Sequence, residues 1–190
     1  YGVHLLEKER CCGVALAANN FGAQAARQAK VNIASMNKAV KAGEKVLTTS
    51  SSCTNMMRNE YPEVLGLSAE GYRDSLELVC KWLYEKMESG EVKLRFRPGF
   101  KMKLSYHTAC HLQRLGWQNY TTELLKLIPG VTLSVLDQNC CGIAGTFGFK
   151  KENYAFSQAI GSKLFDDIKA GGEGAVVATE CETCKWQIEM

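Results

Sequence analysis

The sequence predicts an α/β protein made of two duplicated βαβαβ modules, with parallel sheets and cysteines at the carboxyl ends of the strands. Short apolar stretches typical of strands alternate along the chain with amphipathic stretches typical of helices. This order gives parallel strands joined by right-handed crossovers. A Cys-Cys-Gly motif also occurs twice, at residues 11–13 and 140–142, and such internal similarity indicates a duplicated unit.

The composition of the 190 residues limits the classes of protein to consider. Hydrophobic residues make up 46% of the chain, enough to bury a core, and a net charge of +3 is too small to indicate binding to nucleic acid. The nine cysteines lack the pattern of a small secreted domain. No signal peptide is evident, and no apolar run approaches the roughly 20 residues needed to span a bilayer. These features favour a cytoplasmic protein.

In the first half we expect a strand at residues 1–6, a helix at 22–41 and a strand at 46–49. The second strand ends in a serine-rich turn before Cys53. The helix has a core-facing stripe at spacings of three and four residues, and Gly43 follows its end. The stripe consists of Ala26, Ala29, Ile33, Met36 and Val40.

The segment 68–101 is expected to be a helical connector and linker between modules at 1–67 and 102–190. A helix at 73–88 would carry an apolar face. That face consists of Leu76, Val79, Leu83 and Met87. Residues 81–103 hold seven basic residues against three acidic ones. This strip is either a solvated connector or a docking surface for a partner or an anionic membrane.

The second half has the clearer alternation of elements. Strands are expected at 103–106, 131–136 and 175–178. A helical stretch over 110–127 joins the first two strands, and a helix with an apolar residue at every fourth position from 156 to 168 joins the last two. Three parallel strands with two crossover helices are therefore predicted.

Five cysteines of the second module follow the ends of its three predicted strands. Because the carboxyl ends of parallel strands meet at one edge of a sheet, these side chains are expected to form one site. Five thiols exceed the four ligands of a tetrahedral zinc, which favours an iron–sulfur cluster. Zinc, a disulfide and thiols buried in the core remain alternatives. The set is Cys110, Cys140, Cys141, Cys181 and Cys184.

Several neighbours of these cysteines are candidates for supporting roles. Helix N-termini that follow the strands would stabilise an anionic cluster. Gly142 and Gly145 let the backbone approach a bound cofactor closely, so that amides can donate hydrogen bonds to sulfur. His107 and His111 flank Cys110. They are either ligands or proton carriers at the site, or hydrogen-bonded structural residues.

The first copy of the motif is expected to be an incomplete site. Cys11, Cys12 and Cys53 are present, but Met56 stands at the place of the last cysteine of the second module. A counterpart of the first cysteine would lie upstream of residue 1, so we expect a fragment of a longer chain. Three thiolates, with water or His4 as a fourth ligand, are a candidate zinc site. Otherwise this module is expected to serve as scaffold.

Two stretches resemble the cysteine-rich CCG-domain family: residues 139–148 (NCCGIAGTFG) and 181–190 (CETCKWQIEM). This family includes the B subunit of heterodisulfide reductase and the iron–sulfur subunits of lactate and glycolate oxidation. The chain is most similar to the branch that contains the C subunit of anaerobic glycerol-3-phosphate dehydrogenases. The resemblance implies that the cysteines bind a four-iron cluster, either 4Fe-4S or noncubane.

The resemblance also implies a function and partners. The chain would carry electrons from a flavin-containing dehydrogenase subunit toward menaquinone in anaerobic glycerol metabolism. Membrane-anchoring partners would hold it peripherally at the inner face of the cell membrane. Two other functions remain open: a catalytic subunit that reduces a heterodisulfide or a quinone directly, and a docking module whose cysteines bind structural zinc. No catalytic side chain is assigned.

Overall fold

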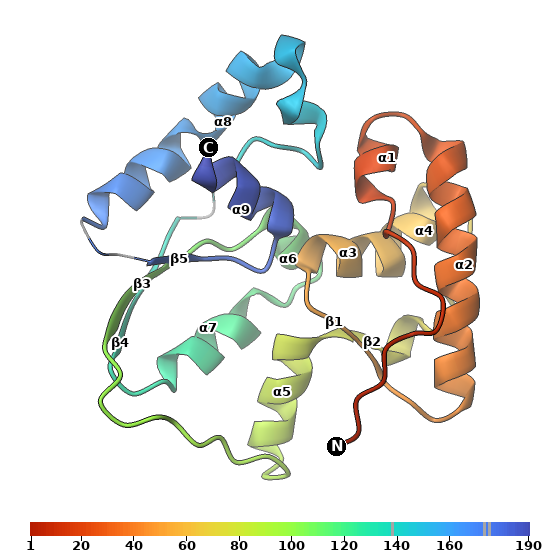
Figure 1. Cartoon of the computed structure of the whole chain (residues 1–190), viewed down its shortest axis with the longest axis horizontal. Helices are drawn as coiled ribbons and strands as arrows, with labels where there is room; N and C mark the ends of the chain where they lie inside the picture. The colour runs from red at the N-terminus through yellow and green to blue at the C-terminus, as the bar shows by residue number, and fades with distance from the viewer. Residues whose placement is uncertain (138, 173, 175) are drawn as a thin grey trace.

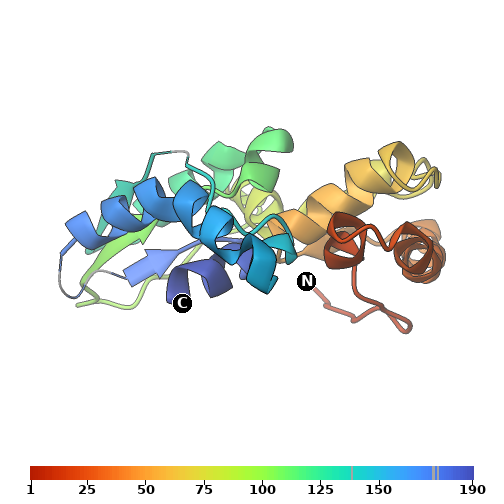
Figure 2. The same ribbon diagram turned by 90° about the horizontal axis from the view of Figure 1, so that it is seen from above.

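The structure is a computed structural model that describes residues 1–137, 139–172, 174 and 176–190. It is a mixed α/β chain whose two halves lie side by side, the first half at the right of Figure 1 and the second at the left. The same arrangement is visible from above in Figure 2. Each half contributes one small parallel sheet. No helix within the described ranges is long and apolar enough to cross a membrane.

The second half has the predicted order of strands and helices. Its three strands are parallel, with β3 between β4 and β5. Tyr106 at the end of β3 pairs with Val135 on one side and Ala178 on the other, so the three carboxyl ends are level. The elements are β3 (Met102–Tyr106), α6 (Cys110–Arg114), α7 (Gln118–Lys126), β4 (Val131–Val135), the 3₁₀ turn η3 (Phe147–Phe149), α8 (Lys151–Ala170), β5 (Val176–Ala178) and α9 (Glu182–Glu189).

The boundaries in this half differ little from the prediction. The helical stretch predicted at 110–127 consists of two helices, and Gly116, with a φ of +71°, lies between them. A glycine in this left-handed conformation is a common way to end a helix. Residue 175, predicted to begin the last strand, lies outside the described residues.

The first half contains the predicted helix with the same bounds, α2 (Gly22–Lys41). Its counterpart α8 also has 20 residues and begins 129 residues later, the interval that separates Cys11 from Cys140. The other elements are α1 (Val14–Ala18), β1 (Val46–Thr48), α3 (Ser51–Asn55), the π-helical turn η1 (Met56–Glu60) and α4 (Tyr61–Glu63). The last three follow one another without a break, as Figure 1 shows beside α2.

The prediction of a strand at residues 1–6 is wrong. This segment joins neither of the two sheets, and Val3 and Leu5 are 87% and 89% exposed. By the interval of 129 residues it corresponds to β4, which pairs with β3. A strand is held by hydrogen bonds to a neighbouring strand, and the described part of the chain places none beside residues 1–6.

The first part of the helix predicted at 73–88 is also wrong. Arg73–Ser75 is a 3₁₀ turn, η2, and Leu76–Leu78 is a strand, β2, which pairs in parallel with β1. Only Val79–Glu88 is helical, as α5. All three residues of β2 are buried, and periodicity alone does not separate a short buried strand from a buried helix. Since β2 lies within the segment assigned to the connector, the domain boundaries stay a prediction.

Each half has its own core, and cysteines belong to both. In the first core, Cys12 packs with residues from α2, β1, β2 and the π-helical turn. In the second, three cysteines pack with Ala109, Ile143 and Leu164. The three are Cys141, Cys181 and Cys184. The candidate sites therefore reach into the packed interior of each half.

Candidate metal centre

The predicted meeting of the three cysteine-bearing loops is present in the second half. Cys110 begins α6 after β3, the pair Cys140–Cys141 lies in the loop after β4, and Cys181 caps α9 after β5. Because the strand ends are level, the loops converge at one edge of the sheet. Cys184, one turn into α9, points to the same place, with its sulfur 3.3 Å from Cys141 Sγ.

The five sulfurs form an unbroken row. The thiols of Cys110 and Cys140, and those of Cys140 and Cys141, are close enough to shift each other's pKa. The row continues through Cys184 to Cys181. Cys110 and Cys140 are exposed, whereas the other three are buried. The row therefore runs from solvent into the core, and none of its five cysteines forms a disulfide.

Hydrogen bonds within the row divide it into thiolates and thiols. Donation by Cys184, with smaller contributions from Ser52 and Thr183, lowers the pKa of Cys181 to about 5. Donation by Cys110 and Cys141 lowers the pKa of Cys140 in the same way. The pKa values of those donors are raised, because each shares its proton with a neighbouring thiolate. Metal ions would take the place of these shared protons.

Backbone amides also stabilise the thiolate forms of two cysteines. The N–H of Gly142 donates to Cys140 Sγ at 3.3 Å, and the N–H of Cys184 donates to Cys181 Sγ at 3.4 Å. Gly142 has a φ of +88°, and a Cβ there would overlap the carbonyl oxygen of Ser157 on α8. A glycine is therefore required for the loop to lie against α8 while its amide faces sulfur.

Gly145 packs against the first half of the chain. A Cβ at this position would lie 2.9 Å from the Cβ of Ala18 on α1. Beside it, Asn19 Nδ2 donates to Thr146 Oγ1 at 2.8 Å. The contact of Gly142 and Gly145 with a cofactor stays a prediction, because their close approaches in this structure are to protein.

His107 differs from the expectation of a hydrogen-bonded structural histidine. It is 1% exposed, and neither ring nitrogen has a hydrogen-bond partner among the described residues. Burial lowers its pKa, opposed by the charge of nearby Cys140. Buried polar atoms in folded proteins almost always have a partner. An orphaned imidazole beside the sulfur row fits a bound group that would accept its hydrogen bond or use it as a ligand.

The clustered cysteines of the second half are consistent with the binding of an iron–sulfur cluster. Across the described ranges, no three His, Cys, Asp or Glu side chains are placed to hold a single metal ion. A mononuclear zinc site needs four donors around one point. In an iron–sulfur cluster the cysteines bind different irons, so the ligands need not surround a single point.

The first half brings together fewer of its candidate ligands. Cys12 and Cys53 are hydrogen-bonded to each other, which raises the pKa of Cys12 and lowers that of Cys53. Cys11 is exposed, and Met56 is fully buried in the core beside Cys12. His4 is turned to Glu44, with 3.0 Å between Nδ1 and Oε1. The zinc site with His4 as a ligand is therefore not formed in the described structure.

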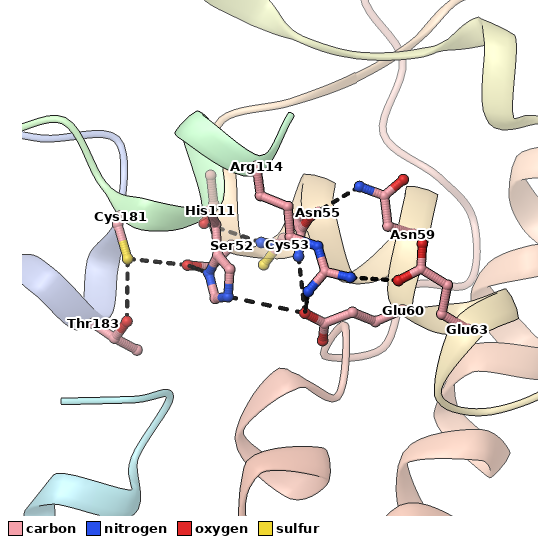
Figure 3. A network of polar contacts seen from close by, with 11 residues as sticks. Ser52, Cys53, Asn55, Asn59, Glu60, Glu63, His111, Arg114, Cys181 and Thr183 are labelled. Carbon is pink, nitrogen blue, oxygen red and sulfur yellow. Dashed lines mark hydrogen bonds and ion pairs between the residues drawn. The ribbon is translucent and has the colours of Figure 1, made fainter. Parts of the chain in front are cut away.

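One neighbour of the centre was missed in the sequence. Ser52, from α3 of the first half, lies with its Oγ 3.0 Å from Cys181 Sγ, as Figure 3 shows. The residue stands in a run of three serines before Cys53, which by itself indicates a turn or a helix cap. Nothing in that run indicates a contact with a residue 129 positions away.

The family of CCG cysteine-rich domains matches the chain over residues 1–58 and 104–189. The chain belongs to this family. The resemblance drawn from residues 139–148 and 181–190 is thereby confirmed, and the two matched segments each contain one Cys-Cys-Gly motif.

Curated relatives place the chain within the family. It is 54% identical over all 190 residues to the C subunit of the anaerobic glycerol-3-phosphate dehydrogenase of Escherichia coli K12, and equally to that of strain O157:H7. It spans 47% of those proteins, about half of their length. It is also 32% identical to lactate utilization protein A 1 of Bacillus anthracis, over 76% of this chain and 60% of that protein.

Proposed function

We propose that this chain is an iron–sulfur electron-transfer subunit of an anaerobic glycerol-3-phosphate dehydrogenase-like complex. In this role it passes electrons from a flavin-containing subunit toward menaquinone. The observation that carries the proposal is the row of five cysteine sulfurs at the carboxyl ends of β3, β4 and β5. The identity with the C subunit of the Escherichia coli enzyme supports the choice of complex. That relative is named as one subunit of an enzyme, which supports the existence of partners.

The five cysteines of the row would hold the cluster, and when bound it supplies a site that accepts and donates single electrons. Cys141, Cys181 and Cys184 are buried, so their end of the site excludes water. Cys110 and Cys140 are exposed and leave the other end open to a partner protein. Buried ligands at one end and an accessible end at the other are what an electron carrier between proteins requires.

Metal analysis with cysteine variants tests this proposal. Iron and acid-labile sulfide would be measured after anaerobic reconstitution of the wild type, Cys181→Ser and Cys184→Ser. Both variants should lose most of the iron, because each removes a sulfur of the row. Cys80→Ser is the matched control, since Cys80 is half-buried on α5 outside the row, and it should keep the iron. Zinc in place of iron, or unchanged iron in both row variants, would contradict the proposal.

An activity assay separates the electron carrier from the alternative of a catalytic reductase. The reconstituted chain would be given an artificial one-electron donor with a heterodisulfide or a quinone. An electron carrier should become reduced and reoxidised without rapid turnover of the disulfide. Multiple turnovers of the disulfide, with the artificial donor as the source of electrons, would favour the reductase.

Peripheral attachment to an anionic membrane surface is part of the same proposal. The basic strip at 81–103 divides into two groups in the structure. Lys81 is paired with Glu77 and Glu85 at 3.1 and 2.6 Å, and Lys86 with Glu91 at 2.8 Å. The remaining five cations have no ion pair among the described residues. They are Lys93, Arg95, Arg97, Lys101 and Lys103.

The cations of the loop between α5 and β3 are interleaved with apolar side chains. Phe96 and Phe100 are both exposed. Cations with aromatic rings between them suit the interface of a bilayer, where each exposed basic residue contributes about 1 kcal/mol near an anionic surface. The loop, rather than the 73–88 segment, is therefore the proposed contact.

Sedimentation with lipid vesicles tests the loop. Vesicles of phosphatidylglycerol and phosphatidylcholine would be mixed with the wild type and with a Lys93→Gln, Arg95→Gln, Arg97→Gln variant at rising salt. Binding should fall with salt and with the triple change. A Lys126→Gln, Lys163→Gln variant is the control, because both lysines are exposed but already paired with carboxylates. Equal binding of all proteins at every salt concentration would exclude the loop.

A further inference from the structure

Ser52 connects the two halves of the chain at the sulfur row. It lies on α3 of the first half and is 4% exposed. Its Oγ is 3.0 Å from Cys181 Sγ and 2.8 Å from His111 Nδ1, so it lies between a predicted ligand and a histidine of the second half. Figure 3 shows this hydroxyl between Cys181 and His111, in a chain of polar contacts that continues through Glu60 to Arg114 and Glu63.

Backbone contacts fix the position of Ser52. The N–H of Ser51 donates to the carbonyl oxygen of Glu180 at 3.0 Å, which ties the start of α3 to the residue before Cys181. The side chain of Ser50 accepts from the N–H of Cys53 and caps the same helix. These contacts therefore fix the backbone that carries the Ser52 hydroxyl.

The arrangement around the hydroxyl indicates where its proton points. A cysteine sulfur bound to iron carries no proton and can only accept a hydrogen bond. Ser52 has one proton to donate, so donation to Cys181 Sγ requires His111 to donate its Nδ1–H to Ser52 Oγ. Glu60 lies 3.9 Å from His111 Nε2 and also contacts Arg114 and Asn55. These contacts from the π-helical turn keep the imidazole beside Ser52.

We propose that Ser52, a residue of the first half, sets the reduction potential of the centre in the second half by donating a hydrogen bond to Cys181 Sγ. The inference rests on the proposed iron–sulfur centre. Hydrogen bonds to ligand sulfurs stabilise the more negative, reduced form and so raise the potential. On reduction the centre gains one electron, and Ser52 keeps its proton. Ser52 is thus a positioning residue that acts through Cys181.

A second hydroxyl provides an internal comparison. Thr183, from the second half, places its Oγ1 3.1 Å from the same sulfur. If the potential depends on hydroxyl donation to Cys181, removal of either hydroxyl should shift it in the same direction. Ser51 is the matched control, because it is buried at the same junction but its Oγ faces the carbonyl oxygen of Glu180 at 3.4 Å.

The test is a mediated redox titration of the reconstituted chain, monitored by electron paramagnetic resonance. Ser52→Ala and Thr183→Val should both have a more negative midpoint potential than the wild type, with the same iron content. Ser52→Thr, which keeps the hydroxyl, and Ser51→Ala should stay near the wild-type potential. A wild-type potential in Ser52→Ala, or an equal shift in Ser51→Ala, would overturn the proposal.

Loss of the centre is a distinct outcome. If Ser52→Ala contains no iron while the wild type does, the hydroxyl serves assembly, and the proposal for the potential is wrong. If the wild type itself contains neither iron nor sulfide, the proposed function fails instead. Iron content of the wild type thus separates failure of the function from failure of the inference.

Discussion

The two halves share a motif and a long helix at the same interval, yet they present different sets of side chains at the motif. α2 and α8 have equal lengths and each follows a Cys-Cys-Gly loop. In the second half five sulfurs form a continuous row, whereas in the first Cys12 and Cys53 form a single hydrogen-bonded pair. Met56 occupies core space where the second half has Cys184. Equal spacing of the motif and the helix therefore preserves a scaffold without preserving a site.

Matched cysteine variants give the largest expected difference between the halves. Cys141→Ser should abolish most iron binding, while Cys12→Ser, at the corresponding place in the first half, should leave the iron and the redox signal intact. The reason is that Cys141 lies in the middle of the sulfur row, whereas Cys12 is hydrogen-bonded to Cys53 outside it. Iron should approach one cluster per chain by metal analysis. Two clusters per chain would remove the distinction between the halves.

The two motif glycines should differ in the stability they confer. Gly142→Ala is expected to lower the free energy of unfolding by roughly 3 kcal/mol or more, from positive φ and overlap with the Ser157 carbonyl. Gly13→Ala should cost about 1–2 kcal/mol, mostly from positive φ, since its Cβ would lie 3.2 Å from that of Ala25. Urea unfolding of the metal-free chain measures both. Equal losses would show that the loops pack alike.

Replacement of His107 should change the stability of the metal-free chain and the amount of bound iron in opposite directions. His107→Leu removes two buried nitrogens that have no partners among the described residues. The free energy of unfolding of the metal-free chain should therefore rise by about 1 kcal/mol. The same change should reduce iron retained after reconstitution. His4→Leu, at an exposed histidine of the first half, should alter neither quantity. A destabilised His107→Leu chain with normal iron would assign the residue to packing.

The smallest effect is expected at the surface between the halves. Arg114→Gln removes ion pairs with Glu60 and Glu63 in the first half. Because Arg114 and Glu63 are both about half exposed, the loss should stay below about 1 kcal/mol and should shrink further at high salt. Thermal unfolding at two salt concentrations checks this. A larger loss would mean that the halves depend on this pair for their association.

Parts of the molecule with a long or repeated signal were predictable from sequence. The bounds of α2 were predicted correctly, but its buried residues are Ala25, Ala29, Asn32 and Met36, of which only Ala29 and Met36 belong to the predicted stripe. The five cysteines of the second half were expected at one edge because each follows a strand, and the structure places them there. In these cases the pattern of residues within one segment was sufficient for the prediction.

The errors arose where a neighbour distant in sequence decides the structure. Residues 1–6 have strand-like composition but no adjacent strand in the described part of the chain, and Leu76–Leu78 is a strand because it lies beside β1. Ser52 reaches Cys181 only through the packing of one half on the other. Likewise, the orphaned nitrogens of His107 depend on what surrounds the side chain. Sequence patterns within one segment contain none of these relations.

The helix that runs from Ser51 to Glu63 includes the π-helical turn Met56–Glu60, so its contacts depend on the number of residues in it as well as on their type. Such a turn holds one residue more than an α-helical turn. Deleting one residue inside the turn would restore regular helix with little change of phase, whereas deleting one residue of α3 would rotate every following side chain by about 100°. Tyr61 would leave the core, or Glu60 would leave His111 and Arg114. A one-residue gap in α3 would therefore break the contacts between the first half and the cysteine-bearing loops of the second, even if no side chain at that contact were replaced.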